Sequence, residues 1–293
     1  MLGESYRSVW SHLMGVPFQL GFVDAGGIRT RYLKAGPADA PPLIMIHGMN
    51  GSLECFCANI EEYSKHFNVL AFDTVGCGFS DRPDVPVYEM THYVQHLEDV
   101  MDVFNIQRAS FVGVSMGTWI AASLALKKPE RVERMVFCAF AGRQRQASWN
   151  MQSLVENVKS RSAASESPTW DNVAKVFEGL IHKPEDVLPD FVKVRQTIFQ
   201  LPGAQAGNAR VLGIVPDDVN ARNHITDDQY ATIAVPTLII VSECDADRIK
   251  ESSRIVAGLM PNGRALEMSE VSHWPQFEDS VAFNRESLEF LRS

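Results

Sequence analysis

The chain lacks the features that mark a membrane protein or a nucleic-acid-binding protein. No apolar run in its 293 residues approaches the roughly 18 residues of a membrane span. Lysine and arginine total 27 against 36 aspartates and glutamates, so the formal net charge is −9 and there is no basic excess to bind a nucleic acid or an anionic membrane surface. The favoured partner is therefore a small molecule, with no nucleic acid and no membrane.

Cysteine is scarce, and its spacing fits neither a disulfide framework nor a zinc site. The five cysteines are an odd number, scattered over positions 55, 57, 77, 138 and 244. Cys55 and Cys57 lack the second pair of ligands that a zinc site needs. Polar residues near the start of the chain, Glu4, Arg7 and His12, interrupt any apolar signal segment. These absences predict a cytoplasmic protein with free thiols.

What is present is the composition of an ordinary folded enzyme. Hydrophobic residues make up 45% and charged residues 22%, which favours neither disorder nor a membrane protein. The length suits one large α/β domain, or one that carries an insertion. Apolar residues recur at helical spacing from Leu2 to Met14. They predict a short amphipathic helix that packs on the body or on a second copy in a homodimer.

Strand and helix patterns alternate over most of the chain. Gln19–Val23 and Ile28–Ala35 predict a hairpin. Further strands are predicted at 43–46, 69–73, 109–114, 134–140, 237–241 and 265–268, and helices at 90–104, directly after Ser115, and at 282–291. This alternation is typical of βαβ units and predicts an α/β fold with a mostly parallel, eight-stranded sheet flanked by helices.

One long segment interrupts the alternation. Residues 142–232 are mostly helical in pattern and rich in polar residues, with a serine-rich stretch at 160–167 that predicts a solvated loop. We expect residues 1–141 and 233–293 to form the core, and residues 142–232 to form an inserted helical cap. The cap should cover the carboxyl edge of the sheet, where open α/β sheets bind their ligands.

A single serine lies between a predicted strand and a predicted helix. Gly113-Val114-Ser115-Met116-Gly117 fits the pattern G-x-S-x-G, with an apolar run before it and an apolar helical run after it. In that setting the serine sits on a sharp turn with its hydroxyl exposed, and small neighbours let strand and helix approach. Ser115 is therefore predicted to be the nucleophile of a serine hydrolase that acts through an acyl-enzyme.

A serine nucleophile needs a base and an acid that orients the base. Of the eight histidines, His273 lies in a loop just after the last predicted strand. Among the acids that follow the strand ending at Val241, Asp245 is best placed and Asp247 is a reserve. The chain order Ser115, Asp245, His273 differs from the orders found in chymotrypsin-like and subtilisin-like proteases.

The oxyanion of an acyl-transfer reaction needs two backbone N–H donors. One is predicted at Met116, directly after the nucleophile, and the other at Met49 in the loop after the third strand. His47, in the same loop, is expected to support the loop rather than to act as a base. No cofactor and no metal are predicted. A metal site on one helix face is a weaker alternative, because no fourth ligand accompanies Glu89, His92 and His96.

These motifs resemble those of the α/β-hydrolase family over roughly Phe18 to Leu291. The landmarks stand in family order: His47-Gly48, Asp73 to Ser80, Gly113 to Gly117, Ser242 to Asp245, and His273. More narrowly, the segment from Ser272 to Glu278 with Phe283-Asn284 is similar to the C-terminal signature of meta-cleavage-product hydrolases. Those enzymes hydrolyse a carbon–carbon bond in ring-fission products of aromatic degradation.

Arg195 stands out in an apolar helical stripe. An arginine there must reach solvent, form an internal salt bridge or bind an anion, since an unpaired buried charge is costly. The resemblance favours a clamp on a substrate carboxylate, for which the guanidinium fork is suited. It also implies that Trp274 is a wall of the pocket.

The chain departs from the family pattern at two places. The glycine-rich oxyanion loop, which follows Gly48, is here Met49-Asn50-Gly51, and the usual polar residue before the nucleophile is Val114. Gly48, Asn50 and Val114 are all expected to contact the substrate. Both departures affect the part of the pocket that would hold a dienol carboxylate during ketonisation.

Ester hydrolysis makes fewer demands, namely attack, oxyanion stabilisation and protonation of the leaving alcohol. Ester hydrolases of aromatic degradation, including those for phthalate monoesters, resemble the same family. The expectation is therefore hydrolysis of a small carboxylate-bearing ester, such as an aromatic-acid monoester, with carbon–carbon hydrolysis of a meta-ring-cleavage product as the alternative. A cofactor-independent dioxygenase and a non-catalytic ligand-binding protein are further alternatives. Ser115 argues against dehalogenases and epoxide hydrolases of this fold, which use an aspartate nucleophile.

Overall fold

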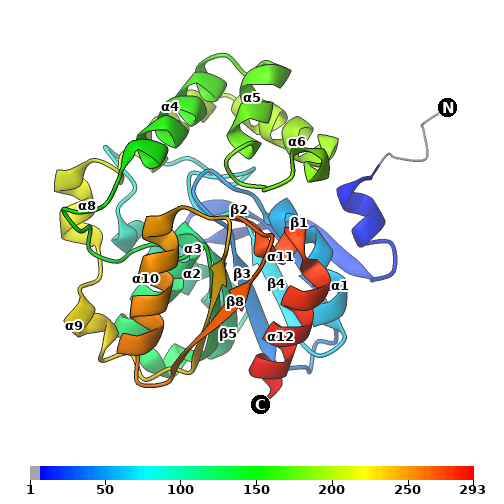
Figure 1. Ribbon diagram of the computed structural model, residues 1–293. Helices are drawn as coiled ribbons and strands as arrows, with labels where there is room; N and C mark the ends of the chain where they lie inside the picture. Colours follow the sequence, from blue (N-terminus) through cyan, green and yellow to red (C-terminus); the bar gives the residue numbers. More distant parts are fainter. Residues whose placement is uncertain (1–6) are drawn as a thin grey trace.

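The computed structural model describes residues 7–293, in which an eight-stranded sheet lies between two helical layers under a helical cap (Figure 1). From one edge to the other the strands are β1 (Phe18–Ala25), β2 (Ile28–Ala35), β4 (Asn68–Phe72), β3 (Pro42–Ile46), β5 (Ala109–Val114), β6 (Val132–Cys138), β7 (Thr237–Ser242) and β8 (Gly263–Met268). Strand β2 pairs antiparallel with β1 and β4, and all other pairs are parallel. The predicted mostly parallel, eight-stranded sheet is confirmed.

Side chains of the central strands alternate between two hydrophobic cores, as the pleat requires. In β3, Ile44 and Ile46 face one core, while Leu43 and Met45 face the other. Because both faces are covered, these strands are continuous apolar runs.

Helices cover each face of the sheet. The core that contains Ile44 also holds side chains of α2 (Met90–Val103), α3 (Met116–Lys127) and α10 (Asp247–Leu259). The opposite core holds side chains of α1 (Cys57–Ser64) and α12 (Ser280–Arg292). At the N-terminal side a 3₁₀ turn, Val9–His12, stands where part of a helix was predicted; residues 2–6 of that prediction lie outside the described residues.

The chain between β6 and β7 contains six helices, which we call the cap. They are α4 (Gln152–Glu166), α5 (Trp170–Phe177), α6 (Pro189–Phe199), α7 (Ala204–Leu212), α8 (Asp217–Asn223) and α9 (Asp227–Tyr230). In Figure 1 the helices α4, α5 and α6 lie above the sheet, well away from the chain terminus at Ser293. The domain boundaries at 141/142 and 232/233 stay predictions.

The solvated loop predicted at 160–167 is wrong. Residues up to Glu166 continue α4, and Ser165 is buried. The Asn208 side chain of α7 donates a hydrogen bond to the Ser165 hydroxyl at 2.8 Å. Packing against α7 therefore supports a helix that the serine-rich composition does not favour, as tertiary contacts commonly override propensity.

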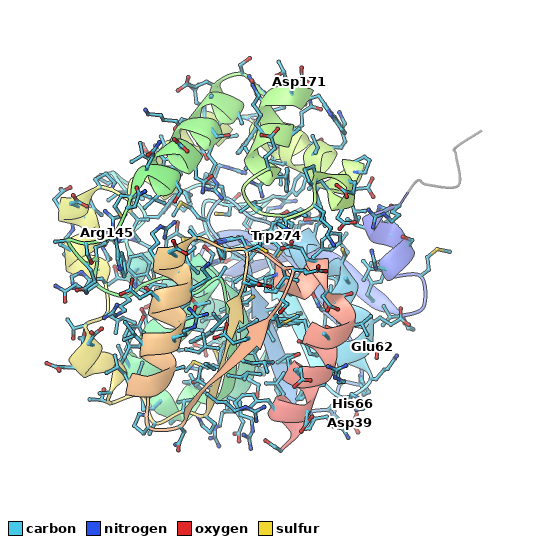
Figure 2. All side chains as sticks on the ribbon, in the orientation of Figure 1. Asp39, Glu62, His66, Arg145, Asp171 and Trp274 are labelled. Atoms are coloured by element: carbon cyan, nitrogen blue, oxygen red, sulfur yellow. The ribbon has the colours of Figure 1, made fainter. Side chains whose placement is uncertain are left out.

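Aromatic side chains join the cap to the core. The Trp274 ring, from the loop before α11 (Pro275–Glu278), lies edge-on to Phe177 at 5.8 Å and to Phe191 at 5.3 Å between ring centroids. Phe191 also meets Phe277, at 4.9 Å. Figure 2 shows Trp274 at the boundary between cap and core. Edge-to-face pairs of this kind stabilise beyond the area that they bury.

None of the described helices combines the length and the apolar character that crossing a membrane requires.

Two histidines are buried in the core beneath the functional edge and accept backbone hydrogen bonds. His47 Nε2 accepts from the Thr74 N–H at 3.0 Å, and His96 Nδ1 accepts from the Val75 N–H at 3.0 Å. Burial is the main cause that lowers the pKa of His47 to about 4 and that of His96 to about 3. Both are therefore neutral in the folded protein near neutral pH.

We predict that the free energy of unfolding decreases as the pH drops below about 6.5, because His47 and His96 then bind protons in the unfolded chain but not in the folded chain. Each buried histidine contributes a slope of at most about 1.4 kcal/mol per pH unit, and the slope ends only below the folded pKa. Urea denaturation at pH 7.5, 6 and 5 measures it. The His96→Asn variant should lose part of the slope, whereas the exposed His66→Asn should keep it. Equal slopes in both variants would contradict this account.

Candidate active site

The serine of the predicted motif sits on a strained turn between β5 and α3. Ser115 has φ 53° and ψ −119°, a backbone conformation that is costly for a non-glycine residue. Hydrogen bonds hold it there: the Ser115 N–H donates to the Cys138 carbonyl at 3.0 Å, and the Thr118 N–H and hydroxyl donate to the Ser115 carbonyl at 2.9 and 2.7 Å. The surrounding chain therefore imposes the turn that exposes the Ser115 side chain.

The glycines on either side of Ser115 allow close backbone approach. A Cβ on Gly113 would lie 2.8 Å from the carbonyl oxygen of Gly117. A Cβ on Gly117 would overlap the backbone carbonyl oxygen of Ile46, at the end of β3. Small residues are therefore required for α3 to pack against the sheet directly after the turn.

His273 and Asp245 meet at the carboxyl ends of the last two strands. Asp245 follows β7, His273 follows β8, and His273 Nδ1 lies 3.0 Å from Asp245 Oδ2. The Ala246 N–H donates to the other carboxylate oxygen at 2.7 Å. Burial opposes ionisation of Asp245, but His273 and these hydrogen bonds outweigh it and lower the pKa of the carboxyl. With Nδ1 turned to Asp245, Nε2 is the ring nitrogen left to take a proton.

The reserve acid lies elsewhere. Asp247 begins α10, its side chain is almost fully exposed, and it pairs with Lys250 at 3.0 Å. Only Asp245 is placed to orient the His273 ring.

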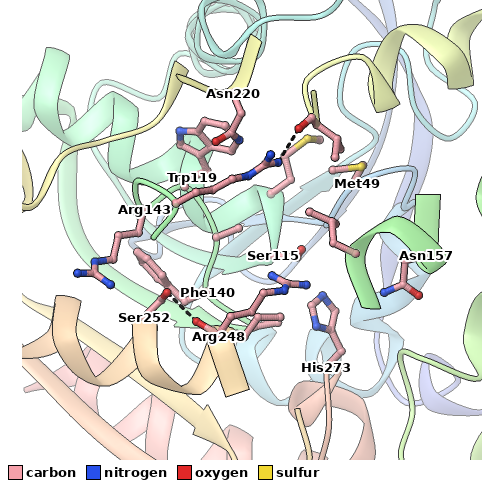
Figure 3. Close-up of a pocket in the computed structure, with 18 of the residues that line it drawn as sticks. Met49, Ser115, Trp119, Phe140, Arg143, Asn157, Asn220, Arg248, Ser252 and His273 are labelled. Atoms are coloured by element: carbon pink, nitrogen blue, oxygen red, sulfur yellow. Dashed lines mark hydrogen bonds between the residues drawn. The ribbon is translucent and has the colours of Figure 1, made fainter. Parts of the chain in front are cut away.

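Ser115 and His273 line the same cavity, which has two chambers. The inner chamber has an empty volume of about 290 Å³ and is walled by the loop after β3 and by Cys55, Leu180, Arg195 and Trp274. The outer chamber has an empty volume of about 920 Å³, part of it open to solvent. Residues that line both chambers mark where they meet: Met49, Ser115, Arg161, Leu180 and His273. Figure 3 shows Ser115 and His273 at this cavity, with Met49 and Asn157 around them.

The loop after β3 is held by His47. Its ring is fully buried, with Nδ1 2.7 Å from the Gly48 carbonyl and Nε2 accepting from Thr74. The Gly51 N–H closes the loop on the Gly48 carbonyl at 2.9 Å. His47 thus occupies the supporting position expected of it, and Met49 lines both chambers. Met116, as the first residue of α3, has an N–H with no acceptor inside the helix.

Of the five residues predicted to contact substrate, three line the inner chamber and two do not. Gly48, Arg195 and Trp274 line it. Val114 is buried in the core that contains Val112 and Cys138, and Asn50 is buried with φ 53°; neither lines either chamber. That Val114 and Asn50 contact the substrate therefore stays a prediction, which the lining of the two chambers does not support.

Arg195 is buried in the inner chamber without a partner. Its side chain comes from α6, the residue is only 3% exposed, and its Nε and Nη1 atoms make no hydrogen bond. The guanidinium carbon lies 5.4 Å from the centre of the Phe177 ring and 5.9 Å from that of Phe199. Burial lowers the pKa of Arg195 to about 10. Arg195 thus neither reaches solvent nor pairs with a carboxylate in the described part of the chain.

A second arginine was missed by the sequence analysis. Arg161 of α4 is 9% exposed, lines both chambers, and has a buried Nε without a partner. Burial and the nearby Arg195 lower its pKa to about 10. The spacing of Leu154, Arg161 and Ala164 on one helix face could have indicated it, had residues 160–167 not been interpreted as a loop.

The outer chamber also carries arginines. Arg143 forms two hydrogen bonds with Asp227, at 2.8 and 2.7 Å, and Arg145 pairs with Asp217. Arg248 of α10 has a buried Nε without a partner (Figure 3). No aspartate or glutamate is among the described residues that line either chamber. The whole cavity therefore favours an anionic ligand.

The metal alternative on α2 is not supported by the side-chain positions. Glu89 pairs with Arg222, His92 caps the helix start, and His96 is bonded to Thr30 and Val75. Within residues 7–293 no group of three or more potential ligands is placed to hold a metal ion.

We predict that Gly117→Ala destabilises the protein by about 2 kcal/mol or more, because the added methyl group meets backbone that cannot move aside. Gly258→Ala is the matched control: Gly258 lies in α10 with nothing within 4 Å of an added Cβ. There alanine should stabilise by up to about 1 kcal/mol. Urea denaturation compares the two, and similar effects in both variants would count against the close approach.

Comparison with known proteins places this geometry in a family. The α/β hydrolase fold family matches residues 41–280. A 2-hydroxymuconate semialdehyde hydrolase of Pseudomonas putida is 26% identical over 91% of this chain and 92% of its own length. A 2-hydroxy-6-oxo-2,4-heptadienoate hydrolase of the same species is also 26% identical, over 91% of this chain and 94% of its own.

A solved structure agrees with this similarity. A serine-to-alanine mutant of the meta-cleavage product hydrolase of Pseudomonas fluorescens IP01, complexed with acetates, has a TM-score of 0.80 and 26% identity. The match covers 93% of this chain and 97% of that one. The chain belongs to the α/β hydrolase fold family, and is similar within it to meta-cleavage product hydrolases.

Proposed function

We propose that this chain is a serine hydrolase that cleaves a carbon–carbon bond in a small, carboxylate-bearing product of meta ring cleavage. Membership of the α/β hydrolase fold family supports a hydrolase. The observation that carries the narrower proposal is the partnerless guanidinium of Arg195, buried in a small chamber that Ser115 and His273 also line. The similarity to hydrolases of 2-hydroxymuconate semialdehyde and 2-hydroxy-6-oxo-2,4-heptadienoate points to the same substrate class.

This reverses the order of preference drawn from the sequence. Ester hydrolysis was favoured there chiefly because of Val114 and the loop Met49-Asn50-Gly51. The Val114 and Asn50 side chains lie outside both chambers, so they bear less on the choice than was expected. The relatives favour the carbon–carbon alternative.

The first half of the proposed reaction uses Ser115 and His273. His273 Nε2 takes the Ser115 hydroxyl proton while Asp245 stabilises the resulting imidazolium, and Ser115 Oγ attacks the ketone carbon of the substrate. The oxyanion that forms is stabilised by the N–H groups of Met49 and Met116. This attack takes place on the keto tautomer of the substrate, in which the dienol proton has moved to the carbon next to the ketone. When the carbonyl reforms as the acyl-enzyme, the carbon–carbon bond breaks, its electron pair is delocalised into the 2-oxo-enoate fragment as a dienolate, and that dienolate takes the proton from His273.

The second half releases the acid. Water loses a proton to His273 and attacks the acyl carbon, and collapse of the second tetrahedral species expels Ser115 Oγ, which takes the proton back. Arg195 would hold the carboxylate of the oxo-acid fragment throughout. A buried charge such as that of Arg195 positions the substrate more strongly than the same contact would in solvent.

Ester hydrolysis is the second candidate. One observation favours it: apart from His273, the inner chamber offers no group free to move a proton to or from a substrate carbon. Both ring nitrogens of His47 are already engaged, with the Gly48 carbonyl and the Thr74 N–H, and burial raises the pKa of the Cys55 thiol well above its usual range. An ester needs only one proton delivered to the leaving oxygen.

We predict that Ser115→Ala or His273→Ala lowers turnover by several orders of magnitude, on the order of 10⁶ as in hydrolases whose triad acts as a unit. Asp245→Asn should cost about 10⁴, because the base loses its orientation. Asp247→Asn is the control and should change turnover less than about twofold, since Asp247 faces solvent. Initial rates on the fastest substrate measure this. Retention of most activity by Ser115→Ala or His273→Ala would refute the assignment.

We further predict that a 2-hydroxy-6-oxo-dienoate is turned over faster than a phthalate-type monoester or a neutral p-nitrophenyl ester. The monoester as fastest substrate would establish the second candidate instead.

Arg195→Gln should lower kcat/KM on either acid-bearing substrate at least about 100-fold, the range for loss of a buried charge partner, and hardly change kcat/KM on the neutral ester. Equal losses on acid and neutral substrates would mean that Arg195 is structural.

A further inference from the structure

We infer that Arg161 is a second binding residue for the substrate's acid group, so that one carboxylate is held between guanidinium groups from two cap helices, α4 and α6. The inference deepens the proposed function and rests on it, because it concerns the same site. It assigns a role to a residue that stands outside the predicted catalytic set.

Arg161 lies beside the catalytic residues. It lies where the two chambers meet, together with Ser115 and His273, and it shares the inner chamber with Arg195. Both arginines are more than nine-tenths buried, and the Nε of each is buried without a hydrogen bond. Two buried guanidinium groups, one from α4 and one from α6, thus line the same small chamber.

The other buried arginines of the described residues are paired with carboxylates. Four arginines are buried among the described residues: Arg31, Arg143, Arg161 and Arg195. Arg31 pairs with Glu54 at 2.5 Å and with Asp73 at 3.4 Å, and Arg143 pairs with Asp227 at 2.7 Å. Of these four, only Arg161 and Arg195 have no carboxylate within salt-bridge distance among the described residues. Because buried charges are normally paired, we expect Arg161 and Arg195 to pair with an anionic group of a ligand.

Counting formal charges indicates how many negative charges the ligand brings. Below Arg195, the cluster of Arg31, Glu54 and Asp73 has two acids and one base, an excess of one negative charge. Glu54 and Arg195 line one small cavity, and this excess faces Arg195 through space. This excess offsets at long range one of the two positive charges of Arg161 and Arg195 and leaves the other uncompensated. A single carboxylate between the two guanidinium groups makes the buried set neutral.

A fork on each side also suits the geometry of a carboxylate. Each guanidinium can donate to one or both carboxylate oxygens, and charge-assisted bonds of this kind are strong where water is excluded. The Asn208 side chain donates to the Arg161 carbonyl at 3.4 Å, so α7 helps to hold this turn of α4 in place. The ligand would link α4 to α6, two helices that otherwise bring like charges together.

A ligand-binding role and a purely structural role of Arg161 predict opposite effects of its substitution on the stability of the free protein. Without ligand, two unpaired positive charges repel in a buried site, so removing one should stabilise the free protein. With ligand, the same substitution should weaken binding. A structural arginine would show the opposite sign in the free protein.

The experiment uses benzoate as the anionic probe and benzamide as its neutral counterpart, with thermal unfolding and isothermal titration on wild type, Arg161→Gln and Lys159→Gln. Lys159 is the matched control, an exposed cation two residues away on α4. In wild type, benzoate should raise the Tm and benzamide should not. Arg161→Gln should raise the Tm of the free protein and raise the Kd for benzoate at least about tenfold, while Lys159→Gln changes both little. Unchanged benzoate affinity in Arg161→Gln would overturn the inference.

A double variant tests whether the two arginines share one carboxylate. If they do, Arg161→Gln/Arg195→Gln should bind benzoate little more weakly than the worse single variant, because the losses are not additive. Fully additive losses would overturn the shared clamp. Should Arg161→Gln fail to fold, Arg161→Lys keeps the charge without the fork, and its Kd should still rise about threefold or more; wild-type affinity would overturn the inference.

Failure here is distinguishable from failure of the proposed function. Benzoate binding needs no turnover. If Arg195→Gln weakens benzoate and Arg161→Gln does not, only the role of Arg161 is lost. If neither variant changes the Kd for benzoate, the inner chamber does not bind acid groups through these arginines, and the proposed substrate class loses its basis.

Discussion

The site depends on the close approach of α3 to the end of β3. Gly117 lets the helix backbone pass the Ile46 carbonyl, an approach that a Cβ at this position would prevent. Ser115, two residues earlier, is held at φ 53°, with its carbonyl and N–H both bonded. The strain at one residue is thus maintained by the packing of a whole helix on the sheet, which is how functional sites commonly retain costly conformations.

The cap adds positive charge without a carboxylate partner to the cavity next to Ser115. The core side of the cavity carries Ser115, His273 and the loop after β3, whereas the cap side carries Arg195 and Arg161 without partners. An overall acidic chain, with a formal charge of −9, therefore surrounds a cavity lined by arginines and by no aspartate or glutamate among its described residues. Under the proposed function, this local reversal of sign selects a small anion.

The fold and the meeting of Asp245 with His273 could be predicted from the sequence because local patterns determine them. Continuous apolar runs such as 43–46, between turn signals, favour strands covered on both faces, and Asp245 and His273 follow strand ends that meet at one edge of a parallel sheet. Arg161 could not be read in this way. The stretch around it is serine-rich, and its helix depends on packing against Asn208 of α7, far along the chain. Nor could the sequence tell which residues near the turns line the cavity: Met49 lines both chambers, whereas Val114 and Asn50 line neither.

A crystal structure of the Ser115→Ala variant with bound benzoate would test the central claim most directly, since it locates the acid group itself. The account predicts the carboxylate in the inner chamber, with its oxygens within hydrogen-bond distance of both Arg161 and Arg195. A carboxylate bound at the Met49 and Met116 amides alone, with both guanidinium groups still unpartnered, would contradict it.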